Sequence, residues 1–317
     1  MKVSKKMLNK ELLPRYPFLK FICMVLMTHL GRHLIAYLLK KSRGKNSPGL
    51  DCSTAFIPSQ SGGPDIRVRI FKPKKCTSKL PGMLYIHGGG YMIGNPEGSM
   101  ISIKKMIDKR PCVVVAPDYR KSIKDPYPAG FNDCYDSLLW MQENATRLGM
   151  ENHHFIVGGT SAGGGLTAAV SLKARDTQAV KIAFQMPIYP MMDDRQITPS
   201  SQQMSVYPWT ANNNKRGWEL YLKNLDRSDL PVYAAAARNK DHQNLPPTIT
   251  FVGDLEPFKD ETIAYVNALR EAGVPVIFSL FKGCNHAFDL LVPRAKVSRK
   301  AHRFLLESYA DFYDRYV

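Results

Sequence analysis

The residue types best suited to catalysis stand in the segment GTSAGG, Gly159 to Gly164. This segment follows a short apolar run, FIVG, and precedes a helical run, GGLTAAVSLKAR. In the pattern G-x-S-x-G a serine occupies a sharp turn between a strand and a helix, and small neighbours let the backbone approach a bound molecule. Ser161 is therefore predicted to be a nucleophile. The alternative is a glycine-rich helix start that binds phosphate or only turns the chain.

A second segment, HGGGY at His87 to Tyr91, directly follows another apolar run. Three consecutive glycines leave backbone N–H groups free to face an oxyanion instead of neighbouring side chains. In the fold class that carries G-x-S-x-G, one oxyanion donor lies in such a loop and another on the residue after the serine, here Ala162. The two segments together predict an acyl-transfer site.

A serine hydroxyl needs a general base, and the base needs an orienting carboxylate, in the chain order serine, acid, histidine. Among the downstream histidines, His242 lies in a polar loop and His302 within a terminal helix. His286, in the loop KGCNHAF after the last strand-like run, is the predicted base. The acid follows the preceding run, TITFVG, where position alone does not separate Asp254, Glu256 and Asp260.

These residues must be positioned by alternating strands and helices, which predict an α/β fold with a mostly parallel sheet and ligands at the strands' carboxyl ends. Amphipathic helices are expected at Phe131 to Leu148 and at Phe258 to Ala272. A long insertion at about 191–246 is predicted to form part of a cap. Eight runs have strand character: Thr54–Ile57, Ile66–Phe71, Met83–His87, Val113–Ala116, Phe155–Gly158, Ile182–Tyr189, Ile249–Gly253 and Val276–Phe281.

The first 50 residues are predicted to be a basic helical cap segment, separate from a hydrolase-type domain at 51–317. Within Phe18 to Leu39 the longest apolar run is short, and Arg32 would lie near the middle of any membrane span. Three interpretations stay open: a helix packed on the protein's own body, an amphipathic helix on an anionic membrane, and a true span or uncleaved signal. The stripe expected to be apolar comprises Phe18, Phe21, Ile22, Val25, Leu26 and Leu30.

Composition and charge exclude several classes of protein. The 317 residues are 44% hydrophobic and 22% charged, which excludes a disordered chain, a collagen and a coiled coil. Of the net charge of +17, residues 1–45 carry +10 and the other 272 residues only +7, which argues against a nucleic-acid groove across the body. The cysteines show neither a disulfide framework nor zinc spacing, which predicts free thiols in a reducing, cytoplasmic compartment and no metal: Cys23, Cys52, Cys76, Cys112, Cys134 and Cys284.

In order along residues 65 to 290, the chain carries HGGGY, APDYR, YPAGFND, GTSAGG, YAAAAR, LPPT, DLEPFKDE and GCNHAF. This set resembles the hormone-sensitive-lipase-like carboxylesterases of the α/β-hydrolases. The resemblance implies an α/β-hydrolase fold with a helical cap, Ser161 as nucleophile and His286 as base. It also implies Gly89, Gly90 and Ala162 as oxyanion donors. The family's usual aspartate aligns with Glu256, so a Ser-His-Glu triad is expected, with Asp254 as the rival acid.

The predicted function is hydrolysis of short- to medium-chain acyl esters through an acyl-enzyme, without a cofactor. Amide or lactone cleavage on the same triad, and a non-catalytic small-molecule-binding relative, are the alternatives. The expected partner is a small-molecule ester, with peripheral membrane contact and a homodimer left open. Five residues are expected either to line an apolar substrate pocket or to pack within the cap: Tyr91, Met92, Tyr207, Trp209 and Trp218.

Overall fold

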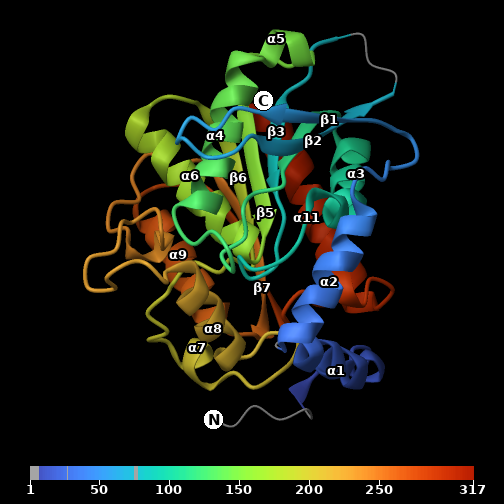
Figure 1. Ribbon diagram of the computed structural model, residues 1–317, viewed down its shortest axis with the longest axis vertical. Coiled ribbons are helices and arrows are strands. Elements are labelled where there is room, and N and C mark those ends of the chain that lie inside the picture. The colour runs from blue at the N-terminus through green and yellow to red at the C-terminus, as the bar shows by residue number, and fades with distance from the viewer. Residues whose placement is uncertain (1–6, 27, 75–77) are drawn as a thin grey trace.

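A computed structural model describes residues 7–26, 28–74 and 78–317, without the side chains of Leu26, His29, Arg32, His33 and Ala36. Within these ranges eight strands form one sheet in the order β1-β2-β4-β3-β5-β6-β7-β8 (Figure 1). The pairings β1–β2 and β2–β4 are antiparallel, and the others are parallel. The strands are β1 Leu50–Ile57, β2 Ile66–Pro73, β3 Gly82–Ile86, β4 Val113–Pro117, β5 Phe155–Thr160, β6 Ile182–Ile188, β7 Thr248–Leu255 and β8 Val276–Asn285.

All eight predicted strands are present, and the predicted α/β class with a mostly parallel sheet is confirmed. The predicted ends of the last two strands are wrong in a way that matters for the site. Both strands continue past Gly253 and Phe281, because an irregularity in their pairing brings Leu255 opposite Asn285. The residues that follow, Glu256 and His286, therefore leave the sheet side by side.

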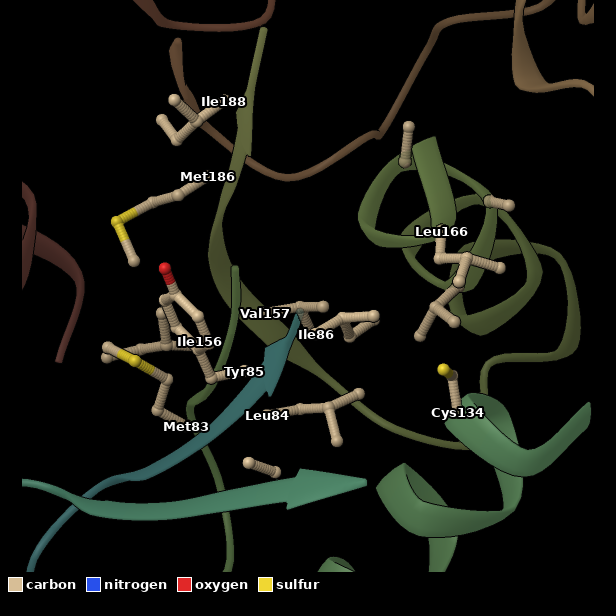
Figure 2. Close-up of a cluster of buried hydrophobic side chains, with 14 of the residues drawn as sticks. Met83, Leu84, Tyr85, Ile86, Cys134, Ile156, Val157, Leu166, Met186 and Ile188 are labelled. Carbon is tan, nitrogen blue, oxygen red and sulfur yellow. The ribbon is translucent and has the colours of Figure 1, made fainter. Parts of the chain in front are cut away.

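Helices cover the sheet on both faces (Figure 1). On one face α3 Met100–Lys109 contacts α11 Lys296–Tyr316, and on the other α4 Ala129–Glu143 contacts α6 Ala162–Thr177. Figure 2 shows the alternation that this layering requires: Leu84 and Ile86 of β3 point toward α4 and α6, whereas Met83 and Tyr85 point to the opposite side. All four side chains are buried, as expected for a strand in the middle of a covered sheet.

The two helices expected from the sequence match their predicted ranges to different degrees. The expected helix at Phe131 to Leu148 is broken at Asn144 into α4 and a short α5, whereas α9 lies close to its predicted range. Helix α9 ends before Gly273, whose φ of +76° is left-handed. The other elements are η2 Leu13–Arg15, α1 Tyr16–Leu26, α2 His29–Ser42, η3 Pro96–Ser99, α5 Ala145–Leu148, α7 Pro199–Gln203, α8 Ala211–Tyr221, η4 Ala236–Arg238, α9 Lys259–Glu271 and α10 Phe288–Leu291.

The apolar N-terminal stretch is two helices, α1 and α2, joined at Thr28, whose side chain caps α2. Helix α1 contacts the body through Leu19 and Cys23, which are buried. The predicted apolar stripe is not this packing face, because Phe18 and Phe21 are 54% and 65% exposed. Met27 and the side chain of Leu26 lie outside the described residues. In the described parts of the chain, no helix combines the length and apolarity that a membrane crossing requires.

Candidate active site

Ser161 stands on the turn between β5 and α6 with φ 58° and ψ −120°, a conformation that L-residues rarely adopt. Hydrogen bonds fix the turn, because its N–H donates to Ile188 O at 2.9 Å and its carbonyl accepts from Met191 N at 3.0 Å. Glycine is required two residues after the serine, since a Cβ on Gly163 would lie 2.1 Å from Ile86 O of β3. The helix can thus approach the sheet closely, with Ser161 Oγ at the sheet's carboxyl edge.

Ser161, His286 and Glu256 are hydrogen-bonded in series. The Nε2 atom of His286 lies 2.9 Å from Ser161 Oγ, and its Nδ1 atom lies 2.5 Å from Glu256 Oε2. The other carboxylate oxygen of Glu256 accepts a hydrogen bond from Gly253 N at 2.8 Å. Glu256 and His286 are 0% and 5% exposed. Both carboxylate oxygens are therefore engaged, and the imidazole has one ring nitrogen on the acid and one on the serine.

The rival acids have other hydrogen-bond partners. Asp254 accepts from Gly283 N at 2.7 Å and so ties β7 to the end of β8. Asp260 accepts from Ser200 N at 2.8 Å, in the long insertion. Neither of the other downstream histidines contacts Ser161: the ring of His242 lies against Tyr265, and His302 lies 3.7 Å from Asp289.

The HGGG loop is held beside the serine by the pairing of β3 with β5, in which Ile86 lies opposite Gly159. Two of its glycines have positive φ: Gly89 at 131° and Gly90 at 59°. A Cβ on Gly90 would lie 2.3 Å from the ring of Trp209, so no side chain fits there. Among the described residues, none accepts a hydrogen bond from the backbone N–H groups of Gly89, Gly90 or Ala162. These donors are therefore free for a bound oxygen atom.

Aromatic rings hold the imidazole of His286 in place. Tyr189 and Phe258 meet it edge to face, with ring centroids 5.1 and 5.0 Å away. Trp209 lies on a third side, at 6.4 Å. The histidine of the HGGG loop is held differently, because His87 stacks on Tyr119 at 4.3 Å and burial lowers its pKa well below the ordinary range. His87 is therefore neutral at pH 7.

A cavity of about 420 Å³ opens above Ser161 and His286. Gly88, Gly89 and Gly90 form part of its base, and its walls are mostly apolar. No cluster of three histidine, cysteine or acidic side chains that could hold a metal ion occurs within the described ranges. The wall residues come from four separate parts of the chain: Phe18, Leu19, Ile22, Cys23, Leu39, Met92, Ile93, Trp209, Leu290 and Leu291.

Residues 83–290, about two thirds of the chain, match the model of a protein family described by the alpha/beta hydrolase fold. The chain belongs to this alpha/beta hydrolase family. The resemblance to its hormone-sensitive-lipase-like carboxylesterase members, stated above from the motifs, is thereby confirmed.

Relatives and solved structures agree with this membership. The carboxylesterase NlhH of Mycobacterium tuberculosis is 32% identical over 238 residues, which cover 73% of this chain and 74% of that protein. The arylesterase of Saccharolobus solfataricus is 30% identical, over 71% and 73% of the two chains. A bacterial heroin esterase has a similar structure, with a TM-score of 0.88 and 30% identity over 98% of this chain and 99% of that one.

In this hydrolase the residues expected at the pocket divide into two groups. Met92 and Trp209 line the cavity. Tyr91 and Trp218 instead pack with Tyr221 away from the cavity lining, and the Tyr91 and Tyr221 rings stack at 4.0 Å. Tyr207 is half-buried and meets Tyr16 edge to face, outside the residues that line the cavity. The rings of these three residues therefore pack against other aromatic side chains and are absent from the residues that line the cavity.

The sequence predicted a cap segment at residues 1–50 but named none of its residues as part of the pocket. Leu19, Ile22 and Cys23 of α1 line the cavity more than 130 residues before Ser161 in the chain. The Cys23 thiol is 2.6 Å from Pro208 O and 2.9 Å from Asn213 Nδ2, which fixes α1 against the insertion. Leu19, Ile22 and Cys23 are residue types that occur in any apolar helix, so no local sequence signal distinguishes them as wall residues.

Proposed function

We propose that this chain is a serine carboxylesterase in which Ser161 is the nucleophile, His286 the general base and Glu256 the orienting acid. The observation that carries the proposal is the hydrogen-bonded series Glu256–His286–Ser161 at the base of an apolar cavity. The coarser class, carboxylic ester hydrolase, follows from the family membership and from relatives named as carboxylesterase and arylesterase.

The reaction begins when Ser161 Oγ attacks the carbonyl carbon of the ester while His286 Nε2 takes the hydroxyl proton. The carbonyl oxygen becomes the oxyanion of a tetrahedral intermediate. Glu256 accepts a hydrogen bond from Nδ1–H, which keeps Nε2 available as the acceptor and stabilises the imidazolium once it forms. The imidazolium then protonates the leaving alcohol. Water repeats the sequence on the acyl-enzyme and releases the acid.

The oxyanion is held in this proposal by the N–H groups of Gly89, Gly90 and Ala162. Each donor of this kind typically lowers the barrier by about 3 kcal/mol, because it is already oriented when charge develops on the oxygen. The left-handed backbone of the two glycines is what turns the loop toward the serine.

We infer that the substrates are esters with short to medium apolar acyl chains. The cavity volume of about 420 Å³ lies within the range of small-molecule sites. The wall is built from aliphatic side chains such as Ile22, Leu39 and Met92, which favour an apolar group over a charged one.

We further propose that residues 1–50 and the insertion at about 191–246 act together as one cap over the hydrolase domain. The two segments contact each other directly through Cys23 with Asn213 and through the rings of Tyr16 and Tyr207. Figure 1 shows α1 at the same end of the molecule as α7 and α8.

A reducing, cytoplasmic compartment is the location we propose. The cysteines of the described residues are all free, and burial raises the pKa of Cys23 to about 11 and that of Cys112 to about 12. Cys76 lies outside the described residues. Protonated, buried thiols of this kind react slowly, so they suit a compartment in which disulfides are not formed.

The decisive test is the mass of the protein after reaction with a fluorophosphonate. We expect one adduct on the wild-type chain and none on Ser161→Ala. Ser171→Ala, which removes another buried hydroxyl from α6, is the matched control and should keep the adduct. A panel of p-nitrophenyl esters, anilides and lactones then separates ester hydrolysis from amide and lactone cleavage. A folded wild-type protein without an adduct would contradict the proposal and favour a non-catalytic binding protein.

A further inference from the structure

Helices α1 and α2 expose an unusual amount of apolar side chain. Phe21 is 65% exposed and Leu30 is 83% exposed, although their neighbours Leu19 and Cys23 are buried. The two helices contact each other at the edge of the molecule (Figure 1). We define the apolar cap face as the exposed residues Phe18, Phe21, Met24, Leu30, Leu34, Tyr37 and Leu38.

Basic residues lie next to members of the apolar cap face in the sequence. Lys20 stands between two of its members on α1, and Lys40 and Lys41 follow it at the end of α2. Over residues 1–45 the sequence has eleven basic residues and a single acid, Glu11. That carboxylate accepts a hydrogen bond from Val297 N, in the body of the protein. The charged side chains of this segment are therefore almost all basic.

The apolar cap face continues into the cavity. Phe18, more than half exposed, also lines the cavity, as does Leu39 of α2. Leu290 and Leu291 of α10 also line the cavity and are 42% and 38% exposed. Some apolar side chains that line the cavity, on α1 and on α10, are thus also exposed on the outer surface.

We propose that the apolar cap face binds an anionic lipid surface and that the cavity opens toward that surface. The part of the proposal that concerns ester entry from the lipid rests on the proposed function, whereas the binding itself does not. Apolar side chains that enter the interface, surrounded by lysines that face anionic headgroups, are the usual composition of a peripheral membrane site.

Charge favours lipid over a second copy of the chain as the occupant. A symmetric contact through this face would bring together two segments that each carry +10 in their first 45 residues. Anionic headgroups neutralise this charge instead, while each exposed phenylalanine or leucine gains from leaving water. A lipid surface is therefore the occupant that both removes the apolar residues from water and neutralises the basic ones.

The test is co-sedimentation of the full-length Ser161→Ala protein with vesicles of phosphatidylcholine alone or with about 30% phosphatidylserine, a content that gives the surface the negative potential of an anionic leaflet. This background removes turnover, so a failed esterase proposal does not affect the binding result. Phe21→Glu/Leu30→Glu removes two members of the apolar cap face that do not line the cavity. Phe56→Glu/Ile197→Glu is the matched control, with two residues 67% and 60% exposed elsewhere and the same change in net charge.

We expect the protein to bind the phosphatidylserine vesicles, and this binding should weaken with added salt. The affinity for these vesicles should fall roughly hundredfold in the Phe21→Glu/Leu30→Glu protein and should not fall in the control. In the catalytically intact chain, the same pair should slow hydrolysis of an ester dissolved in the vesicles and leave a soluble acetyl ester unaffected. Equal binding by both double variants would overturn the proposal. So would a wild-type dimer, measured by light scattering, that Phe21→Glu/Leu30→Glu dissociates without any vesicle binding.

Discussion

The base and the wall of the cavity are built in different ways. At the base, Ser161, Glu256 and His286 follow directly from strand ends and are joined by hydrogen bonds of 2.5 and 2.9 Å. The wall formed by α1 and α2 consists of side chains such as Phe18 and Ile22, which face the cavity without directional contacts to its base.

In the proposed mechanism, the base of the cavity carries out the reaction and the wall selects the substrate. A proton transfer requires atoms at hydrogen-bond distance, and here the three side chains are fixed by the strand ends that they follow. An apolar wall requires volume and hydrophobicity, which many side chains supply. Changes at the base should therefore alter kcat for every ester, whereas changes in the wall should alter the preference among esters.

The largest effect is expected from Glu256→Gln. An amide at this position carries no negative charge to stabilise the imidazolium, and it favours the wrong tautomer of His286. We therefore expect kcat to fall roughly 10³- to 10⁴-fold for all acyl chains. The measurement is kcat and KM on acetyl and octanoyl esters, with circular dichroism to verify folding.

Asp254→Asn is the matched control for that change. Asp254 lies two residues earlier and accepts hydrogen bonds from Gly283 and Cys284, which an asparagine oxygen can still accept. Its kcat should stay within about tenfold of the wild type. If Asp254→Asn were the more damaging change, the acid in this proposal would be wrongly assigned.

The base of the cavity was largely predictable from the sequence. GTSAGG and HGGGY are local patterns whose residue types are required by a sharp turn and a free backbone, and the expected order of serine, acid and histidine located His286. Position along the chain did not separate the three carboxylates, and Glu256 was expected only from the resemblance to the carboxylesterase family. The approach of Glu256 to His286 depends on the irregular pairing that brings Leu255 opposite Asn285, which no local sequence pattern predicts.

The wall could not be predicted in the same way. The residues of α1 are as apolar as those of many packed helices, and their spacing indicated a stripe that turned out to face solvent at Phe18 and Phe21. Which face of α1 meets the body is decided by contacts with residues nearly two hundred positions away, such as Cys23 with Asn213. Long-range contacts of this kind leave no periodic signal in either segment.

A change in the wall should shift chain-length preference by a smaller factor. Ile22→Trp places a larger side chain in the wall and so reduces the cavity volume. We therefore expect kcat/KM for an octanoyl ester to fall roughly tenfold, while that for an acetyl ester stays close to wild type. Phe21→Trp, at the neighbouring exposed position, is the control and should leave both values unchanged. Equal losses on both esters would indicate that α1 supports the base as well, and the distinction between base and wall would fail.

The smallest effect is expected from Asp289. Its side chain is buried on α10, next in sequence to the wall residues Leu290 and Leu291. Burial raises its pKa from 3.8 to about 6. Nearby His302 does not offset the charge, since burial and Lys105 lower its pKa to about 4 and it is neutral above that pH.

Because the folded chain holds the Asp289 proton to a higher pH than the unfolded chain, stability is lost as pH rises from about 4 to 6 and above, by about 3 kcal/mol in total. Asp289→Asn removes this ionisation. Its free energy of unfolding relative to wild type should therefore be about 1 kcal/mol more favourable at pH 8 than at pH 5, measured by urea denaturation. Parallel pH profiles for the two proteins would mean that Asp289 is solvated in the folded state, and the packing of α10 under the cavity would then be looser than that of the strand ends beside it.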